Sequence, residues 1–168
     1  HQFALVRHSD KSEAIARFLD VDPDLYGVVF CRTRRDTQAL AEDLLKRGYR
    51  ADALHGEMSQ AQRDRVMLRF KQKHLQVLVA TDVAARGIDV DNLTHVFHHS
   101  LPGEAAYYTH RSGRTARAGK NGISLALMGV KERGHLNRLS RTLDIEVTQA
   151  MVPNPEEIVH ARLSTWGK

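Results

Sequence analysis

The sequence predicts an α/β protein with an open, mostly parallel sheet of about five or six strands and helices on both faces. Three observations support this prediction. Short continuous apolar runs, typical of strands covered on both faces, alternate with segments whose apolar residues recur at helical spacing. Glycine, proline or a helix-capping residue separates most of these segments. Parallel strands also need crossovers, and right-handed helical crossovers place helices on both faces of the sheet.

The first part of the chain contains an apolar entry segment and one clear strand–helix unit. Residues 3–6 are apolar, and the apolar residues that follow at helical spacing predict a helix over 12–19. Residues 27–32 form a short apolar run and predict a buried strand. Thr33 is the expected N-cap of the next helix, and Gly48 should end that helix.

The same alternation continues to the end of the chain. The expected strands are 51–55, 76–80, 94–98 and 122–128, and further helices are expected after Ser59, after Gly103 and around Leu136. We expect one domain over residues 1–150. Residues 151–168 should begin a C-terminal linker or extension, because two prolines interrupt the chain before a short helical pattern resumes.

Composition narrows the class of protein. The chain has 168 residues, 42% of them hydrophobic and 27% charged, as in ordinary globular proteins. The formal net charge of +5 favours a polyanionic partner.

Cys31 is the single cysteine, so an internal disulfide is excluded; its place in an apolar run predicts a core residue. No apolar run approaches a membrane span and no signal peptide opens the chain, so we expect a cytoplasmic protein with no membrane partner. The ten histidines show no HExxH or Cys/His pairing, so no metal site is predicted.

The segment 110–120 is the densest basic cluster. It contains His110 and four cations, which are Arg111, Arg114, Arg117 and Lys120. If this segment is helical, positions three or four residues apart gather its cations on one side. Arginine can bind phosphate oxygens with two parallel hydrogen bonds, so the cluster suits a phosphate group. The alternative is a solvent-exposed basic helix end, which is the commoner explanation of an isolated charge run.

Polar residues also follow the predicted strands, where ligands bind in open parallel sheets. Thr33 and Arg34 follow one strand, Gly56 follows the next, and Gln60 and Arg63 lie one helical turn apart after it. Helix N-termini present free N–H groups, so two of them at one edge suggest a groove that tracks a nucleic-acid strand. Alternatively, these residues are only caps and surface arginines.

A second dense cluster, residues 81–89, follows the most apolar strand. Thr81 and Asp82 begin it, Gly87 would give close backbone access, and Asp89 could accept hydrogen bonds from a ribose. A structural turn is the competing account. A complete nucleotide site also needs a G-x-x-x-x-G-K-[ST] loop and carboxylates for Mg²⁺, and neither is found. The chain could therefore supply arginines to a nucleotide but not its main phosphate cradle.

Taken together, these segments resemble the DEAD-box RNA helicases. Residues 28–34 resemble motif IV, Gln60 to Arg63 the QxxR motif, residues 80–89 motif V, and residues 110–119 motif VI. The motifs occur in the family's order, so the chain resembles the second, C-terminal RecA-like domain. Ser112, Ala116 and Lys120 depart from the common motif VI, which leaves its arginines intact.

The resemblance implies a role for each candidate residue. Arg114 and Arg117 would act as arginine fingers toward the γ-phosphate of ATP, Gly87 and Asp89 would face the nucleotide ribose, and His110 would contact the first RecA-like domain. The residues expected to hold the RNA sugar-phosphate backbone are Thr33, Arg34, Gly56, Gln60, Arg63 and Thr81. ATP with Mg²⁺ would be bound mainly by the first domain, which also holds the metal.

The implied function is ATP-dependent unwinding of short RNA duplexes, with sequence-independent RNA binding and with this domain inactive as an ATPase when alone. Two alternatives remain: a nucleic-acid-binding module without catalysis, and a DNA-directed helicase of a related family. Residues 152–158 are similar to the segment that follows this domain in bacterial cold-shock-type members.

Overall fold

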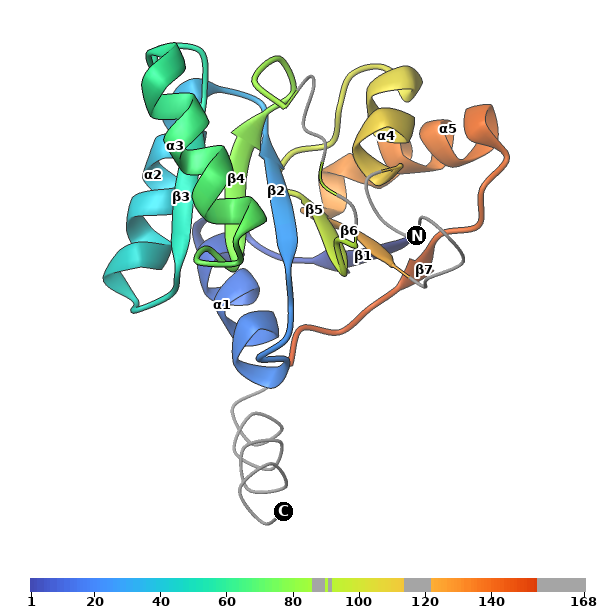
Figure 1. The fold of residues 1–168 in the computed structure, drawn as a ribbon. Helices are drawn as coiled ribbons and strands as arrows, with labels where there is room; N and C mark the ends of the chain where they lie inside the picture. The colour runs from blue at the N-terminus through green and yellow to red at the C-terminus, as the bar shows by residue number, and fades with distance from the viewer. Residues whose placement is uncertain (86–89, 91, 114–121, 154–168) are drawn as a thin grey trace.

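The computed structural model describes residues 1–85, 90, 92–113 and 122–153. These residues form one open β-sheet with helices packed against it (Figure 1). The sheet has seven strands in the order β3-β4-β2-β5-β6-β1-β7, and every strand pair is parallel. The strands are β1 (Gln2–Leu5), β2 (Gly27–Cys31), β3 (Ala51–Leu54), β4 (Val77–Thr81), β5 (His95–His98), β6 (Ile123–Met128) and β7 (Thr148–Gln149). The predicted fold class is confirmed.

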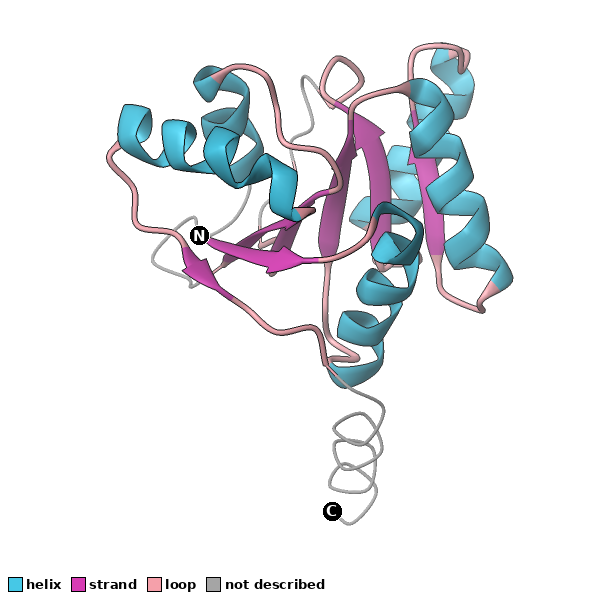
Figure 2. Ribbon diagram, turned by 180° about the vertical axis from the view of Figure 1, so that it is seen from behind, coloured by secondary structure: helices cyan, strands magenta, loops and turns pink. Residues whose placement is uncertain are grey.

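Helices cover both faces of the sheet (Figure 2). They are α1 (Lys11–Val21), α2 (Arg34–Lys46), α3 (Gln60–Lys71), α4 (Ala105–Ser112) and α5 (Arg133–Leu143), with short 3-10 turns η1 (His8–Asp10) and η3 (Val130–Glu132). Helices α1 and α2 pack on one face, where Val29 and Cys31 of β2 point. On the other face, α3 packs against Val28 and Phe30 of the same strand, while α4 and α5 cover β1 and β6.

The sheet has two strands more than the five runs identified clearly in the sequence. The entry segment forms β1, which pairs with β6 and β7. Strand β7 has only two residues and both are exposed, so no apolar pattern marks it. The sheet therefore has one strand more than the predicted five or six.

The parallel arrangement brings four strand ends together. Cys31 at the end of β2 is in register with Thr81 of β4, and Leu54 of β3 is in register with Ala80. On the other side of β2, Phe30 is in register with His98 of β5. The loops that follow these strands therefore leave the sheet side by side, as the sequence pattern required for a shared site.

No helix among the described residues is both long and apolar enough to cross a membrane.

Gly27 lies where β2 packs closely against β5, so a substitution at Gly27 tests this packing. A Cβ atom at Gly27 would lie 2.9 Å from the backbone oxygen of His95, closer than such atoms approach. Gly27→Ala should therefore lower the free energy of unfolding by about 1–3 kcal/mol, measured by urea denaturation. The control is Gly134→Ala in α5, where nothing lies within 4 Å of the added Cβ. That change should leave stability the same or raise it by up to about 1 kcal/mol. Equal effects at the two positions would contradict the packing account.

Candidate functional site

The loop after β2 begins the candidate site. Thr33 is the N-cap of α2: its side chain accepts a hydrogen bond from the N–H of Asp36 at 3.1 Å, and its carbonyl accepts one from the hydroxyl of Thr37 at 2.8 Å. The capping role expected of Thr33 is confirmed, and it leaves the α2 N-terminus ordered at the sheet edge. Arg34 is exposed and forms an ion pair with Glu57 at 2.7 Å. This pair joins the loops after β2 and β3.

The loop after β3 carries Gly56 and leads into α3. Nothing lies within 4 Å of a Cβ built on Gly56, so its backbone is open to a ligand. Ser59 and Gln62 form a reciprocal capping box at the start of α3. This box fixes the helix N-terminus, and with it Gln60 and Arg63, at the same edge of the sheet.

Gln60 and Arg63 differ in their contacts although they are one helical turn apart. The Gln60 amide donates to Asp64 at 2.8 Å on the helix surface. Arg63 is half-buried and donates from Nη2 to the carbonyl oxygen of Ala84 at 3.3 Å, in the loop after β4. Arg63 therefore holds two edge loops together and is more than a surface charge.

The loop after β4 begins with a turn built on Thr81. The Thr81 hydroxyl accepts from the N–H of Ala84 at 3.3 Å, and its carbonyl accepts from the N–H of Ala85 at 3.0 Å. The structural turn is thus present at the start of this segment. Gly87 and Asp89 lie outside the described residues.

Arg111 of α4 is the centre of the site. Only 2% of this side chain is exposed, and it binds Asp82 through two hydrogen bonds, Nε to Oδ1 at 2.6 Å and Nη2 to Oδ2 at 2.7 Å. Its Nη1 donates to the Ser100 carbonyl at 2.7 Å, and its guanidinium lies 5.2 Å from the centre of the Phe30 ring. A single buried cation therefore links the loops after β4 and β5 to the last turn of α4.

A buried polar chain continues from Arg111 into the sheet. Nη1 of Arg111 lies 3.4 Å from Nδ1 of His98, and Nε2 of His98 lies 2.8 Å from the Ser124 hydroxyl. Ser124 is in turn 2.8 Å from the Ser112 hydroxyl. Burial lowers the pKa of His98 well below its ordinary value, and the neighbouring Arg111 charge lowers it further. His98 is therefore neutral, accepting from Arg111 at Nδ1 and donating from Nε2 to Ser124.

The first two residues of the basic segment differ in their exposure. His110 is exposed and Arg111 is buried, although they are neighbours in α4. Helix α4 ends at Ser112 with Gly113 as its C-cap, so of the basic segment it contains only His110 and Arg111. Arg114 and Arg117 lie outside the described residues.

Sequence reasoning left Arg111 without a role and missed Asp82 and His98 as its partners. One signal was present: Arg111 is three residues after Tyr108, which is 1% exposed, so both share the buried side of α4. The sequence alone did not single out Arg111, because all the arginines of the basic segment look equivalent there.

A reactive cysteine and a bound metal ion are two further candidates for chemistry in this chain. Burial raises the pKa of the Cys31 thiol to about 12, so this core residue is not a thiolate nucleophile. Among the described residues, no three His, Cys, Asp or Glu side chains gather closely enough to hold a metal ion.

Known proteins are similar to this chain in sequence and in fold. The helicase conserved C-terminal domain family matches residues 10–119. The DEAD-box ATP-dependent RNA helicase CshA of Geobacillus kaustophilus is 38% identical over 157 residues, which are 94% of this chain and 34% of that protein. The chain thus spans about a third of the length of the curated relatives it matches.

Solved structures of DEAD-box proteins are also similar to this chain. A DEAD box protein from the hyperthermophile Methanococcus jannaschii superposes with a TM-score of 0.82 at 40% identity, covering 89% of this chain and 41% of that one. A variant of S. cerevisiae Dbp5, solved bound to RNA and ADP BeF3, gives a TM-score of 0.85 at 26% identity and covers 100% of this chain and 45% of that one.

Removing the Arg111 side chain should destabilise the fold. Arg111→Ala leaves the Asp82 carboxylate and the Ser100 carbonyl without their donor, so the free energy of unfolding should fall by about 3 kcal/mol or more in urea denaturation. Arg111→Lys should also destabilise, because lysine cannot form the two parallel bonds to Asp82. Arg138→Ala, at an exposed site on α5, is the control and should change stability by less than about 0.5 kcal/mol. If Arg111→Ala is as mild as the control, the buried pair does not hold the site.

Proposed function

The chain belongs to the helicase conserved C-terminal domain family and is the C-terminal helicase domain of a DEAD-box RNA helicase; from this we propose that it is the second RecA-like domain of an enzyme that hydrolyses ATP to separate short RNA duplexes. In this proposal residues 1–150 form the domain and residues 151–168 begin a linker. The observation that carries the proposal is the gathering of the loops after β2, β3, β4 and β5 at one edge of a parallel sheet, where the Arg111–Asp82 pair joins the loop after β4 to α4.

We propose that the RNA backbone lies along this edge. The α2 and α3 N-termini supply N–H groups, Gly56 leaves room for close approach, and Arg34 and Arg63 supply positive charge. Thr33, Gln60 and Thr81 complete the contact set with hydroxyl and amide groups. These groups would contact phosphate and sugar rather than base edges, so binding would be independent of sequence and sensitive to salt.

ATP would bind between this domain and the first one. When bound, ATP supplies the phosphoryl group whose transfer to water releases energy. The roles we propose in this chain are limited to charge and position: Arg114 and Arg117 stabilise charge on the γ-phosphate, Gly87 and Asp89 contact the ribose, and His110 contacts the first domain. The exposed position of His110 at the end of α4 is compatible with that contact. Mg²⁺ would be held mainly by the first domain, as the family resemblance implies, and no group of three His, Cys, Asp or Glu residues among the described residues could hold a metal ion.

We further propose that Arg111 is the positioning residue between the two ligands. It is buried and lies three residues before Arg114 in the sequence, and its partner Asp82 follows Thr81 directly. A buried, doubly hydrogen-bonded arginine has little freedom, so it would fix the start of the arginine-finger segment relative to the RNA-contacting loop. Domain closure on ATP would then be transmitted to RNA, bending one strand, and hydrolysis would restore the open state.

The arginine fingers can be tested by turnover. In the protein that includes the first domain, Arg114→Ala and Arg117→Ala should each lower RNA-stimulated ATP turnover by about 10³–10⁵-fold, because each removes charge that stabilises the transition state. Arg138→Ala should leave turnover unchanged. Unchanged turnover in both finger variants would show that these arginines have another role, and stimulation by DNA as strong as by RNA would favour a DNA-directed enzyme.

The RNA groove can be tested through salt dependence. Arg63→Ala should weaken binding of single-stranded RNA to a similar extent for different sequences, and should reduce the slope of log affinity against log salt by about 0.7–1. Fluorescence anisotropy across a salt series measures both quantities, with Arg138→Ala as the charge-matched control. A loss confined to one RNA sequence would contradict contact with the backbone.

A further inference from the structure

The loop between β5 and α4 is held by side chains from four different parts of the chain. We call residues 99–102 the clamped loop, because each of its four backbone carbonyl oxygens accepts a hydrogen bond from a side chain. The four bonds run from Lys11 Nζ to His99, from Arg111 Nη1 to Ser100 at 2.7 Å, from Arg32 Nη2 to Leu101 at 3.4 Å and from His135 Nε2 to Pro102 at 2.7 Å. The donors belong to α1, to α4, to the residue after β2 and to α5.

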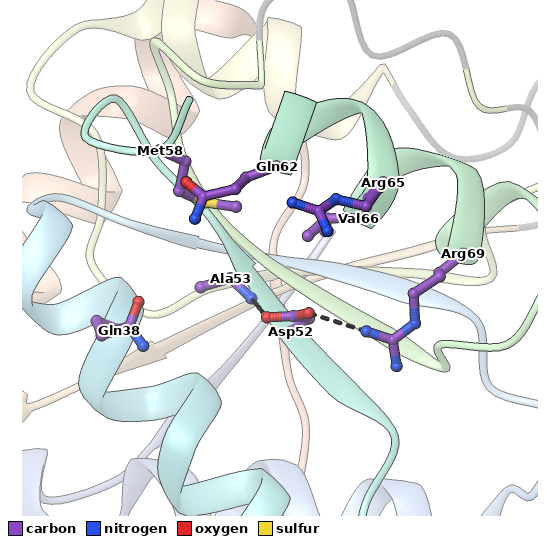
Figure 3. Close-up of a pocket in the computed structure, with 8 residues that line it drawn as sticks. All are labelled: Gln38, Asp52, Ala53, Met58, Gln62, Arg65, Val66 and Arg69. Carbon is purple, nitrogen blue, oxygen red and sulfur yellow. Dashed lines mark hydrogen bonds and ion pairs between the residues drawn. The ribbon is translucent and has the colours of Figure 1, made fainter. Parts of the chain in front are cut away.

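These donors differ from the ion pairs found elsewhere in the domain. In the groove beside β3, Arg69 of α3 pairs with the Asp52 carboxylate at 3.1 Å (Figure 3). Such a pair joins two side chains. Donors that bind backbone oxygens instead fix the path of the main chain itself, and four of them in succession fix it over the whole clamped loop.

The clamped loop has little else to hold it. Its one backbone hydrogen bond within the described part of the chain runs from the His99 N–H to the Phe30 carbonyl at 2.9 Å. The His99 ring is buried, and its Nδ1 has no hydrogen-bond partner among the described residues. Helix α4 follows the loop, and its N-cap residue Glu104 makes no capping bond through its side chain. The side-chain donors to the loop therefore determine where α4 starts.

Lys11 is the donor whose burial is hardest to explain by stability alone. Its side chain is 3% exposed, and no carboxylate in the described ranges lies within ion-pair distance of it. Burial lowers the pKa of Lys11 below its ordinary value, because the charged form loses its hydration. A buried charge without an ion pair is unfavourable for folding. A methionine of similar length would fill this space without that penalty, but it could not donate to the His99 carbonyl.

We propose that Lys11 is a positioning residue for ATP turnover: by holding the His99 carbonyl it fixes the loop from which α4 starts, and with it the arginine-finger segment that follows α4 in the sequence. The inference rests on the proposed function, which assigns Arg114 and Arg117 to the γ-phosphate. The last turn of α4 is already tied to Asp82 through Arg111. Lys11 would thus fix the first end of the helix and Arg111 the other.

The proposal separates catalysis from ligand binding. Arginine fingers stabilise charge in the transition state, so their displacement lowers kcat, and a displacement of about 1 Å can lower a rate by about 10²-fold. The hydrogen bond described for Lys11 involves no residue of the proposed RNA contact set. Loss of Lys11 should therefore leave RNA binding in place.

The test uses the protein that includes the first domain. Lys11→Met should lower kcat for RNA-stimulated ATP turnover by about tenfold or more, while KM for ATP and the affinity for single-stranded RNA stay within about twofold. Lys46→Met is the matched control, since it makes the same change at an exposed position at the end of α2, and it should alter none of these quantities. All variants are compared at a temperature where urea denaturation shows them to be folded.

A double-mutant cycle distinguishes positioning from a general loss of structure. If Lys11 acts through the fingers, adding Lys11→Met to Arg114→Ala should lower turnover by a smaller factor than Lys11→Met does alone. Unchanged kcat in folded Lys11→Met, or factors that multiply in full, would overturn the proposal. Weaker RNA binding with unchanged kcat would also overturn it, because Lys11 would then serve the RNA site.

His135→Leu provides a second test if Lys11→Met does not fold. It removes the donor to the Pro102 carbonyl from a half-buried position on α5. It should lower kcat by about threefold or more with KM for ATP unchanged, and an unchanged kcat would overturn the proposal. Unchanged turnover in Arg114→Ala would instead refute the finger role on which the inference rests. That outcome is recognised separately, because it does not involve the clamped loop.

Discussion

The bidentate ion pair between Arg111 and Asp82 is the interaction on which the arrangement of the site depends. A buried guanidinium is tolerated only when its donors are satisfied, and here the donors reach a carboxylate, a backbone carbonyl and a neutral histidine. Those partners belong to the ends of β4 and β5, which lie on either side of β2 in the sheet. The pair therefore fixes the position of α4 relative to the loop that begins at Thr81. Loss of either partner would release both segments at once.

The parallel sheet explains why different surfaces of one small domain can serve different partners. Its carboxyl edge collects the loops after β2, β3, β4 and β5, and helix N-termini add positive potential there. At its lateral edge, a groove beside β3 is lined by side chains of α2 and α3 instead. Helix α3 borders both regions, since Arg63 turns toward the loop after β4 and Arg65 toward the β3 edge. Two residues of one helix thus face different surfaces of the domain.

Apolar runs and caps were enough to predict the fold class and most elements. Continuous runs such as 27–32 mark strands buried on both faces, and Thr33 and Ser59 mark helix starts that the structure confirms. Strand β7 escaped because two exposed residues leave no pattern. The role of Arg111 escaped for a different reason: burial of a charge depends on partners distant in sequence, here Asp82 and His98, and periodicity in one helix does not identify them. The motif order indicated which residues to examine, whereas only the fold distinguished the buried arginine from exposed His110.

Coupling between ATP and RNA binding is the property that the Arg111–Asp82 pair should control most directly. The measurement is the ATP dissociation constant of the protein that includes the first domain, with and without saturating single-stranded RNA, for the unaltered protein and for Arg111→Lys at a temperature where both are folded. Lysine keeps the charge but loses the two parallel bonds, so the factor by which RNA tightens ATP binding should fall toward one. An unchanged coupling factor in folded Arg111→Lys would contradict the conclusion that this pair connects the two ligand sites.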